Sequence, residues 1–251
     1  MTLITFTSDF GLSDHYVAQS KARILTEYPD ANIIDISHQT KPFDLADIAF
    51  VISSTYQDFP KGTIHFIGGD SGNTKNQHYL FAEIEEHFFV APDSGVLSLI
   101  SEKTPSSIVR LNIEENAYRE IPGIVGKIAR GEKLESLGTP ITEYKQYLKR
   151  KSRATKKEIS GHVIHVDHYG NLITNIEKID FDILSRNRKY SISFGREQVT
   201  GIQQFTNEVD PGDVFIIFND GGQMMIGINQ GSGSQLLGME YDSPVIIQFE
   251  E

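Results

Sequence analysis

The sequence contains no cysteine, which excludes disulfide bonds, thiolate metal sites and cysteine nucleophiles together. It also lacks any run of roughly 18 or more apolar residues, so no segment is predicted to cross a membrane. Basic side chains are scarce, because 23 Lys and Arg stand against 34 Asp and Glu and the formal net charge is −11. Affinity for nucleic acids comes mainly from Lys and Arg on phosphates, so this balance argues against a nucleic-acid-binding protein.

What is present is typical of a globular protein. The 251 residues are 39% hydrophobic and 23% charged, which is enough for one large domain or two modest ones with buried cores. The first residues, Met1–Phe6, lead directly into a strand-like segment, without the basic and apolar regions of a signal peptide. We therefore expect a cytoplasmic protein.

Residues 1–144 alternate strand and helix patterns, which predicts an α/β domain with a mostly parallel sheet covered on both faces. Helices are predicted at 16–27, at 45–57 after Asp44, and at 121–130 before a glycine stop at Gly131. The strands are predicted from Ile, Val, Phe and Thr content at 3–7, 32–36, 63–68, 79–84, 88–91 and 107–111.

Beyond this domain the composition changes twice. Residues 145–157 hold seven basic side chains and are predicted to form a solvated linker, with an anion-attracting patch as the alternative. In 158–251 the helical period disappears, and short strands separated by Gly, Asn and Asp predict an all-β barrel. These strands are expected at 158–166, 172–176, 190–194, 214–218, 224–228 and 245–249.

The loop after the first strand, Ser8–Asp14, is the sharpest chemical feature, because ligands of α/β sheets bind beyond the carboxyl ends of strands. Asp9 and Asp14 could accept hydrogen bonds from a diol such as a ribose, and Phe10 between them is a further candidate for binding. The same carboxylates would repel a phosphate, which favours a nucleoside over a nucleotide. The alternative is that Asp14 caps the following helix and Asp9 is a turn residue.

Two further loops follow strands on the same predicted edge. Gly68–Asn73 contains Asp70, which could orient or deprotonate a water, and Asn73, a candidate binding residue; the alternative is a simple turn. Ala91–Leu97 is interpreted structurally, with Asp93 or Ser94 capping the next helix.

In the second domain, residues 166–171 and 219–222 are predicted to be hairpin connections. The first could nevertheless supply the carboxylate of Asp167, the ring of Tyr169 and the amide of Asn171 to a ligand. His162 and His165 fall on opposite faces of their strand, so no metal site is predicted. The chain has no Walker A sequence, nucleophile elbow or HExxH motif, which argues against serine and metal hydrolysis.

Taken in order, the segments resemble one family, the S-adenosyl-L-methionine (SAM) hydroxide adenosyltransferases, which are related to the SAM-dependent fluorinase and chlorinase. Any one segment is weak evidence, but together they are specific and span both domains. The matching stretches are TSDFGLSDHYV (7–17), IIDISHQTKPFDLADIAF (33–50), FPKGTIHFIGGDSG (59–72), HFFVAPDSGVLSL (87–99), IARGEKLESLGTPI (128–141), HVDHYGNLITNI (165–176) and FNDGGQMMIGINQG (218–231).

The resemblance implies an α/β domain followed by a β-barrel, in a homotrimer whose sites lie between neighbouring subunits. It implies that Asp9 holds the ribose hydroxyls with Asp14 nearby, and that Phe43 packs on the sugar. Asp167 and Asn171 would hold the methionine portion or the adenine edge, and Tyr169 would stack on the base. Backbone groups around Asn229 and Gln230 would face the adenine.

The reaction implied by the resemblance is attack of water on the ribose C5′ of SAM, giving adenosine and L-methionine without a metal or other cofactor. The family activates this water with an Asp, an Arg and a His, and Asp70 matches the first. Gln77 stands where the Arg is expected, with Lys75 and His78 beside it, and Asn116 stands in place of the His. This departure leaves a non-catalytic binder of SAM or adenosine as the alternative, followed by a halide-using transferase and a site for another nucleoside.

Overall fold

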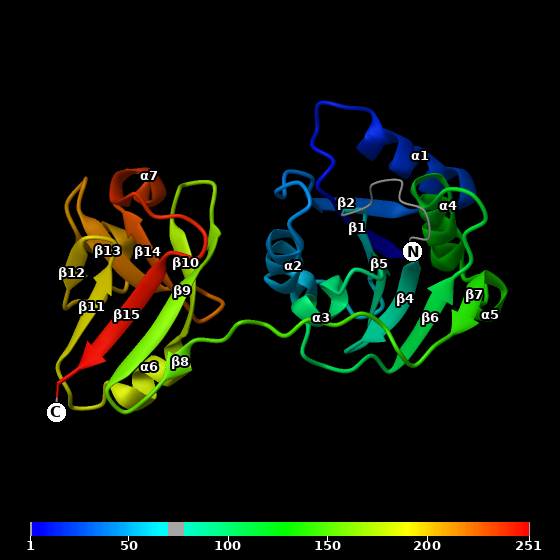
Figure 1. Ribbon diagram of the computed structural model, residues 1–251. Coiled ribbons are helices and arrows are strands. Elements are labelled where there is room, and N and C mark those ends of the chain that lie inside the picture. The colour runs from blue at the N-terminus through cyan, green and yellow to red at the C-terminus, as the bar shows by residue number, and fades with distance from the viewer. Residues whose placement is uncertain (1, 70–77, 251) are drawn as a thin grey trace. The chain divides into compact units, whose positions relative to one another are not determined.

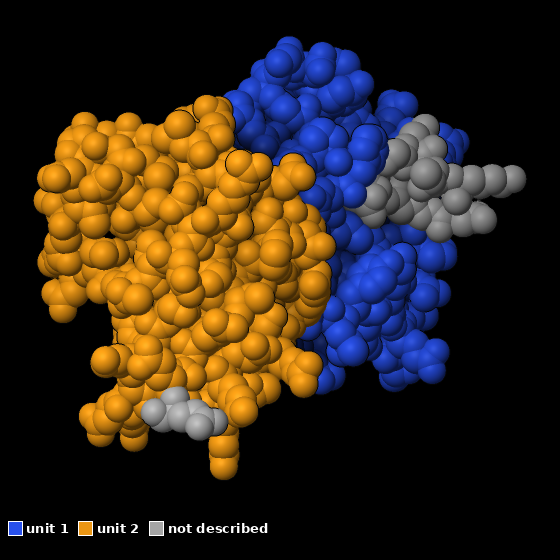
Figure 2. All heavy atoms as spheres, turned by 60° about the vertical axis from the view of Figure 1, so that its left-hand side comes forward, with its two compact units in different colours: residues 1–149 blue, residues 150–251 orange. Residues whose placement is uncertain are grey.

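The computed structural model describes residues 2–69 and 78–250 (Figure 1). The chain divides into two compact units, Met1–Lys149 and Arg150–Glu251, which Figure 2 colours separately and which we describe one at a time. The division falls inside the basic segment 145–157. Among the described residues, no helix combines the length and the apolar character needed to cross a membrane.

Unit 1 alternates strands with helices, and all the strands predicted in it are present (Figure 1). Its helices are α1 (Tyr16–Glu27), α2 (Leu45–Ser53), the 3₁₀ helix η1 (Tyr56–Asp58), α3 (Val96–Ile100), α4 (Ala117–Arg130) and α5 (Leu134–Leu137). Its strands are β1 (Leu3–Thr7), β2 (Asn32–Ser37), β3 (Ile64–Ile67), β4 (Tyr79–Ile84), β5 (His87–Pro92), β6 (Ser107–Leu111) and β7 (Gly138–Pro140).

The sheet of unit 1 is mixed, so the prediction of a mostly parallel sheet is only partly right. Its seven strands lie in the order β2-β1-β3-β5-β4-β6-β7. The pairs β2–β1, β1–β3 and β3–β5 are parallel. The pairs β5–β4, β4–β6 and β6–β7 are antiparallel, and β4 turns directly into β5 through the short Glu85–Glu86 connection. The parallel half brings the carboxyl ends of β1 and β3 to one edge.

Helices cover both faces of this sheet, as predicted. On one face, Ile4 and Phe6 of β1 pack with Ile24 of α1 and Val125 of α4. On the other face, the core contains Ile67 and Phe89 with residues of α2 and α3. Strands buried on both sides read as nearly continuous apolar runs, which is why the sequence located them well.

Helix α4 begins at Ala117, four residues before the predicted start at Ile121. Pro122 therefore lies inside the helix rather than at its beginning. A proline lacks the N–H that would bond the carbonyl of Tyr118, four residues earlier. The guanidinium of Arg23 on α1 donates to that carbonyl instead, at 3.1 Å. A side chain from another helix therefore makes the extra turn possible.

Unit 2 contains one antiparallel sheet in the order β12-β11-β15-β9-β10-β14-β13, with β8 paired to β9. No pairing of β12 with β13 closes the sheet within the described residues, so it is a curled antiparallel sheet rather than the closed barrel predicted. Its strands are β8 (Arg153–Ala154), β9 (Glu158–Val166), β10 (Leu172–Glu177), β11 (Tyr190–Phe194), β12 (Glu197–Val199), β13 (Val214–Phe218), β14 (Gln223–Ile228) and β15 (Pro244–Phe249).

The expectation that helices are absent from this unit is wrong. Helix α6 (Lys178–Leu184) follows β10 and buries Phe181 against the core, while α7 (Gly233–Leu237) follows β14. The 3₁₀ helix η2 (Thr206–Glu208) lies between β12 and β13. All three are short and tertiary contacts hold them, so the sequence carries little periodic signal for them.

The first part of the basic segment lies against unit 1. The amide of Lys145 donates to Asp93, and the amide of Tyr147 donates to the hydroxyl of Ser98. A side chain on Gly95 would collide with the ring of Tyr147, since an added Cβ would lie 2.4 Å from it. The backbone of these residues is thus held on unit 1, while the residues themselves stay exposed.

Candidate functional site

The carboxylate of Asp9 lies between two loops at the carboxyl edge of the parallel strands. Its Oδ2 accepts a hydrogen bond of 3.0 Å from the amide of Phe43, which precedes α2. Its Oδ1 would lie 3.5 Å from a Cβ added to Gly69, the second residue after β3. The structure thus brings Asp9 and Phe43, 34 residues apart, into direct contact. The ring of Phe43 is 75% exposed, so an accessible aromatic ring belongs to the residue whose amide binds this carboxylate.

Backbone strain accompanies this contact. Phe43 has a φ of 63°, in the left-handed region that non-glycine residues rarely adopt. Such conformations cost free energy and persist where surrounding contacts impose them. Here the amide of Phe43 bonds Asp9, and the next residue, Asp44, caps α2 by accepting from the amides of Ala46 and Asp47.

The loop that carries Asp9 is joined to the loop after β2 by several hydrogen bonds. The amide of Ser8 donates to Ser37 O, and that of Gly11 donates to His38 O. The hydroxyl of Thr40 donates to Ser8 O at 3.0 Å. The side chains of Ser8 and His38 are themselves 2.7 Å apart. Sequence reasoning missed Ser8 and His38; the only available signal was a Ser and a His directly after two strands predicted to be neighbours in the sheet.

Phe10 and Asp14 have different surroundings from Asp9. The ring of Phe10 packs edge-on against Phe6 and Tyr118, so it belongs to the cluster beneath the loop. Asp14 is exposed, and helix α1 begins after it with His15 at the N-cap position. The alternative interpretation of Asp14 as the helix cap is therefore wrong, because the helix starts one residue later than that interpretation requires.

Asn116 has a structural partner of its own. It is the N-cap of α4, and its side chain accepts a hydrogen bond from the amide of Arg119. Glu120 completes the cap by accepting from the amides of residues 114, 115 and 116. Burial raises the pKa of Glu120, but these backbone donors outweigh it and the net direction is downward. Asn116 also borders a polar hollow of about 890 Å³ between α1 and α4.

Three of the predicted site residues, Asp70, Asn73 and Gln77, lie outside the described residues. Near them in sequence, the loop after β5 is described. The prediction that Asp93 or Ser94 caps α3 is wrong, because Gly95, with a φ of 98°, occupies the N-cap position. Asp93 instead accepts the amide of Lys145.

In unit 2, the β9–β10 connection is a hairpin whose tip is organised by Asp167. One carboxylate oxygen accepts from the amides of Tyr169 and Asn171, and the other accepts from the side-chain amide of Asn171 at 2.9 Å. The ring of Tyr169 is left 78% exposed. A carboxylate, an amide and an accessible ring therefore share one rigid turn. The second predicted hairpin, 219–222, is also present.

This hairpin tip packs against the segment that joins β14 to α7. The carbonyl of Gly170 accepts from the amide of Ser234, and a Cβ on Gly170 would lie 2.2 Å from Ser232 Oγ. Asn229 and Gln230 belong to the same segment. The amide of Asn229 already donates to Asp213, whereas Gln230 is exposed with a φ of 59°.

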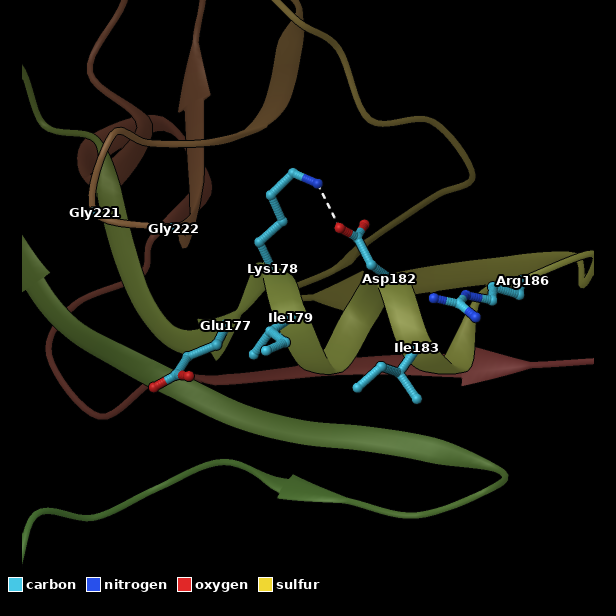
Figure 3. A pocket seen from close by; sticks show the side chains of 8 residues that line it. All are labelled: Glu177, Lys178, Ile179, Asp182, Ile183, Arg186, Gly221 and Gly222. Atoms are coloured by element: carbon cyan, nitrogen blue, oxygen red, sulfur yellow. Dashed lines mark hydrogen bonds and ion pairs between the residues drawn. The ribbon is translucent and has the colours of Figure 1, made fainter.

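A second hollow, of about 530 Å³, lies on unit 2 beside α6 (Figure 3). Figure 3 shows Lys178 paired with Asp182 on one side of the helix, while Ile179 and Ile183 point away from that pair. None of the predicted site residues lines it. Within residues 2–69 and 78–250, no group of three or more His, Cys, Asp or Glu side chains is placed to hold a metal ion.

Comparison with known proteins matches both units of the chain to one family. Residues 4–125 match the model of the SAM hydroxide adenosyltransferase N-terminal domain, and residues 161–246 match that of the C-terminal domain. The first match contains Asp9 and Phe43, and the second contains Asp167, Asn171 and Asn229.

Individual relatives and structures are similar over most of the chain. The (R)-S-adenosyl-L-methionine hydrolase of Methanocaldococcus jannaschii is 31% identical over 186 residues, covering 71% of this chain and 68% of that protein. A fluorinase from Actinoplanes is 26% identical over 218 residues, covering 72% of this chain and 73% of the fluorinase. A crystal structure of an uncharacterized Thermotoga maritima protein superposes with a TM-score of 0.87 at 27% identity, covering 98% of this chain and 99% of that one. The chain belongs to the SAM hydroxide adenosyltransferase family.

Proposed function

We propose that this protein hydrolyses SAM to adenosine and L-methionine by attack of water at the ribose C5′. The observation that supports it most is the contact between Asp9 and Phe43 in a chain of this family. A carboxylate can accept hydrogen bonds from both hydroxyls of a ribose, and the exposed ring of the residue bonded to it is available to cover the sugar face. The hydrolase of Methanocaldococcus jannaschii named above is similar over most of this chain.

The chemistry suits a site built from carboxylates, amides and aromatic rings. Oxygen of water forms a bond to C5′ while the C5′–sulfur bond breaks and its electron pair goes to sulfur. The sulfonium thereby leaves as a neutral thioether, and no general acid is needed at the leaving group. The water loses one proton, so a base and an in-line position for the water are required. No metal or other cofactor is needed in this scheme.

We infer that Asp70 supplies the carboxylate that orients this water, as the sequence resemblance implies. Gln77 and Asn116 replace the Arg and His of the family's arrangement. Replacement of the Arg by Gln77 removes a cation that would favour the charged form of Asp70. The proposal therefore includes a reaction that Asp70 supports without those two partners, with Lys75 or His78 as partial replacements.

We also propose that Asp167, Tyr169 and Asn171 bind the methionine or adenine portion, with the backbone near Gln230 facing the base. The functional assembly would be a homotrimer in which neighbouring subunits complete each site. A trimer in solution, with SAM affinity lost when it is dissociated, is the expected behaviour.

The direct test is incubation of the purified protein with SAM, followed by chromatography of adenosine and methionine, with Asp70→Asn as the matched blank. Both sulfonium epimers are tested, because the relatives' names specify the R form. Release of both products by the wild type alone supports the proposal. SAM binding without release identifies a non-catalytic binder, and 5′-halogenated adenosine formed on addition of chloride or fluoride identifies a halide-using transferase.

A further inference from the structure

Behind the Asp9 loop lies a continuous chain of polar side chains that the proposed reaction does not use. Ser8 Oγ is 2.7 Å from His38 Nδ1, and His38 Nε2 is 3.1 Å from Asp35 Oδ1. Lys21 then forms an ion pair with the other oxygen of Asp35. Ser8 is 0% and His38 is 3% exposed, so the chain runs from the surface into the interior directly under the site.

The donors and acceptors of this chain are consistent with one protonation state. Burial lowers the pKa of His38, although Asp35 opposes this effect, so the ring is neutral near pH 7. With the proton on Nε2, the ring makes a close electrostatic contact with the Asp35 carboxylate, without hydrogen-bond geometry, and Nδ1 accepts from the hydroxyl of Ser8. The same hydroxyl oxygen accepts from the amide of Phe10 at 3.4 Å. Each interaction thus supports the next.

A Ser, a His and an Asp in contact suggest nucleophilic catalysis, but the geometry argues against it here. Ser8 has no exposed surface from which to reach a ligand. The histidine is also turned the opposite way from a hydrolytic triad, with Ser8 on Nδ1 and Asp35 on Nε2. These groups therefore act through their neighbours in the chain.

The neighbour on which they converge is Asp9. On one side, Ser8 is bonded to the ring of His38; on the other, Gly11 N donates to the carbonyl of His38. His38 thus clamps both ends of the short loop that carries Asp9. We propose that His38, held by Ser8 and Asp35, is a positioning residue that fixes the Asp9 carboxylate for the substrate ribose. This inference rests on the proposed function, since it assigns Asp9 to the same ligand.

A second buried hydroxyl–histidine pair, within β1 and β3, serves as a matched control for the Ser8–His38 pair. Thr5 Oγ1 is 2.7 Å from His65 Nδ1, the same distance as in the Ser8–His38 pair, and Thr5 is likewise buried. Thr5 precedes Ser8 by three residues, but it lies within β1 rather than in the loop that carries Asp9. Removing either hydroxyl costs a comparable buried hydrogen bond, and only one of the two should alter the site.

The experiment compares Ser8→Ala with Thr5→Val. We expect Ser8→Ala to weaken adenosine binding roughly tenfold by titration calorimetry and to raise KM for SAM by a similar factor, with kcat nearly unchanged. Thr5→Val should leave both constants within about twofold of wild type, while its melting temperature falls as much as that of Ser8→Ala. Equal affinities in the two variants would overturn the positioning role.

A double-mutant cycle shows whether the effect passes through Asp9. In an Asp9→Ala background, Ser8→Ala should cause no further loss of adenosine affinity; a full tenfold loss there would contradict the inference. As a second pair, His38→Asn keeps an acceptor for Ser8 and should bind more tightly than His38→Leu, whereas equal binding by these two would also contradict it. If wild type binds SAM while Ser8→Ala is unaffected, only this inference fails. If wild type binds neither SAM nor adenosine, the proposed function fails with it.

Discussion

At the residue scale, Asp9 combines an internal role with the capacity to bind a ligand. An ionised carboxylate offers about four acceptor positions, so one group can accept the Phe43 amide and still accept from a ribose. Asp167 is in a similar position, because its two oxygens hold the hairpin tip. Binding and local structure are thus coupled in both units.

Replacing Asp9 by alanine should weaken SAM and adenosine binding by about 1–3 kcal/mol, because the hydroxyls of a buried diol lose a charged acceptor. Titration calorimetry measures this directly. Asp30→Ala, at an exposed position after α1, is the matched control for the loss of one negative charge. Equal affinity of Asp9→Ala and Asp30→Ala would return Asp9 to the role of a turn residue.

The sequence allowed prediction of Asp9 as a candidate, because a polar loop directly follows a strongly apolar strand. It did not reveal Ser8 and His38 as partners, since their contact spans 30 residues and depends on how β1 and β2 align. For Asp14, by contrast, the local sequence pattern was misleading. Its local pattern suggested a cap, but the helix begins at Tyr16.

At the scale of single elements, the start of α4 shows how one side chain can be committed to structure. Asn116 accepts the Arg119 amide, and the helix continues through Pro122 with help from Arg23. The sequence predicted the start only at Ile121, whereas the helix begins at Ala117. The compensating contact comes from α1 and has no local signature.

Asn116→Ala should lower the free energy of unfolding by about 1 kcal/mol, the usual cost of losing an N-cap. Asn116→Asp keeps an acceptor for the Arg119 amide and should retain most of the stability. Chemical denaturation followed by circular dichroism compares the two variants. If kcat for SAM falls more than tenfold in both variants, Asn116 takes part in the reaction as well; unchanged stability in the alanine variant would contradict the capping role.

The β9–β10 and β13–β14 hairpins of unit 2 contain a matched pair of glycines. Gly170 has a φ of 84° and would place a Cβ 2.2 Å from Ser232 Oγ, whereas Gly222 has a φ of 75° and open space around it. We expect Gly222→Ala to cost about 1–2 kcal/mol from backbone strain alone. Gly170→Ala should cost more and should also weaken SAM binding, because Ser232 must move.

Urea unfolding and SAM titration of both alanine variants provide the comparison. Equal losses of stability, or unaltered SAM affinity of Gly170→Ala, would show that the packing of the hairpin tip on Ser232 does not support the site.

At the scale of the whole molecule, the buried histidines make stability depend on pH. Thr5, His65 and His87 form a hydrogen-bonded row inside unit 1, with His65 Nε2 3.1 Å from His87 Nδ1. Burial, with a smaller contribution from His87, lowers the pKa of His65 from 6.5 to about 3. Burial also lowers the pKa values of His38, His87 and His162.

The row of histidines should make unit 1 less stable in acid. The unfolded chain binds a proton at His65 below about pH 6.5, whereas the folded state does so only near pH 3. The contribution of neutral His65 to the free energy of unfolding is therefore fully present above pH 6.5. It falls as the pH drops through this window, by about 1.4 kcal/mol per pH unit for each proton involved. Urea unfolding at several pH values measures this slope.

His65→Gln should reduce the slope, because the side chain at this position no longer titrates, although stability at pH 7 also falls. His168→Gln is the matched control, since His168 is exposed on the β9–β10 hairpin. Identical slopes in the wild type and His65→Gln would contradict the assignment of acid sensitivity to this buried row.

The two-unit organisation was predictable from the sequence because strand and helix patterns change near the basic segment. The lack of pairing between β12 and β13 in the described second sheet was not, since each is joined to its neighbour by a local hairpin that leaves its outer edge undetermined. The mixed character of the first sheet arises from the tight β4–β5 turn, where Glu85 and Glu86 both adopt positive φ. Neither residue is typical of such a turn, which is why the antiparallel pair was missed.

Attack of water at C5′ of SAM can be followed directly by oxygen labelling. The protein is incubated with SAM in water enriched in ¹⁸O, and the products are analysed by mass spectrometry. We expect one ¹⁸O atom in the 5′-hydroxyl of adenosine and none in methionine. Unlabelled adenosine, or products from cleavage of another sulfur–carbon bond, would contradict it.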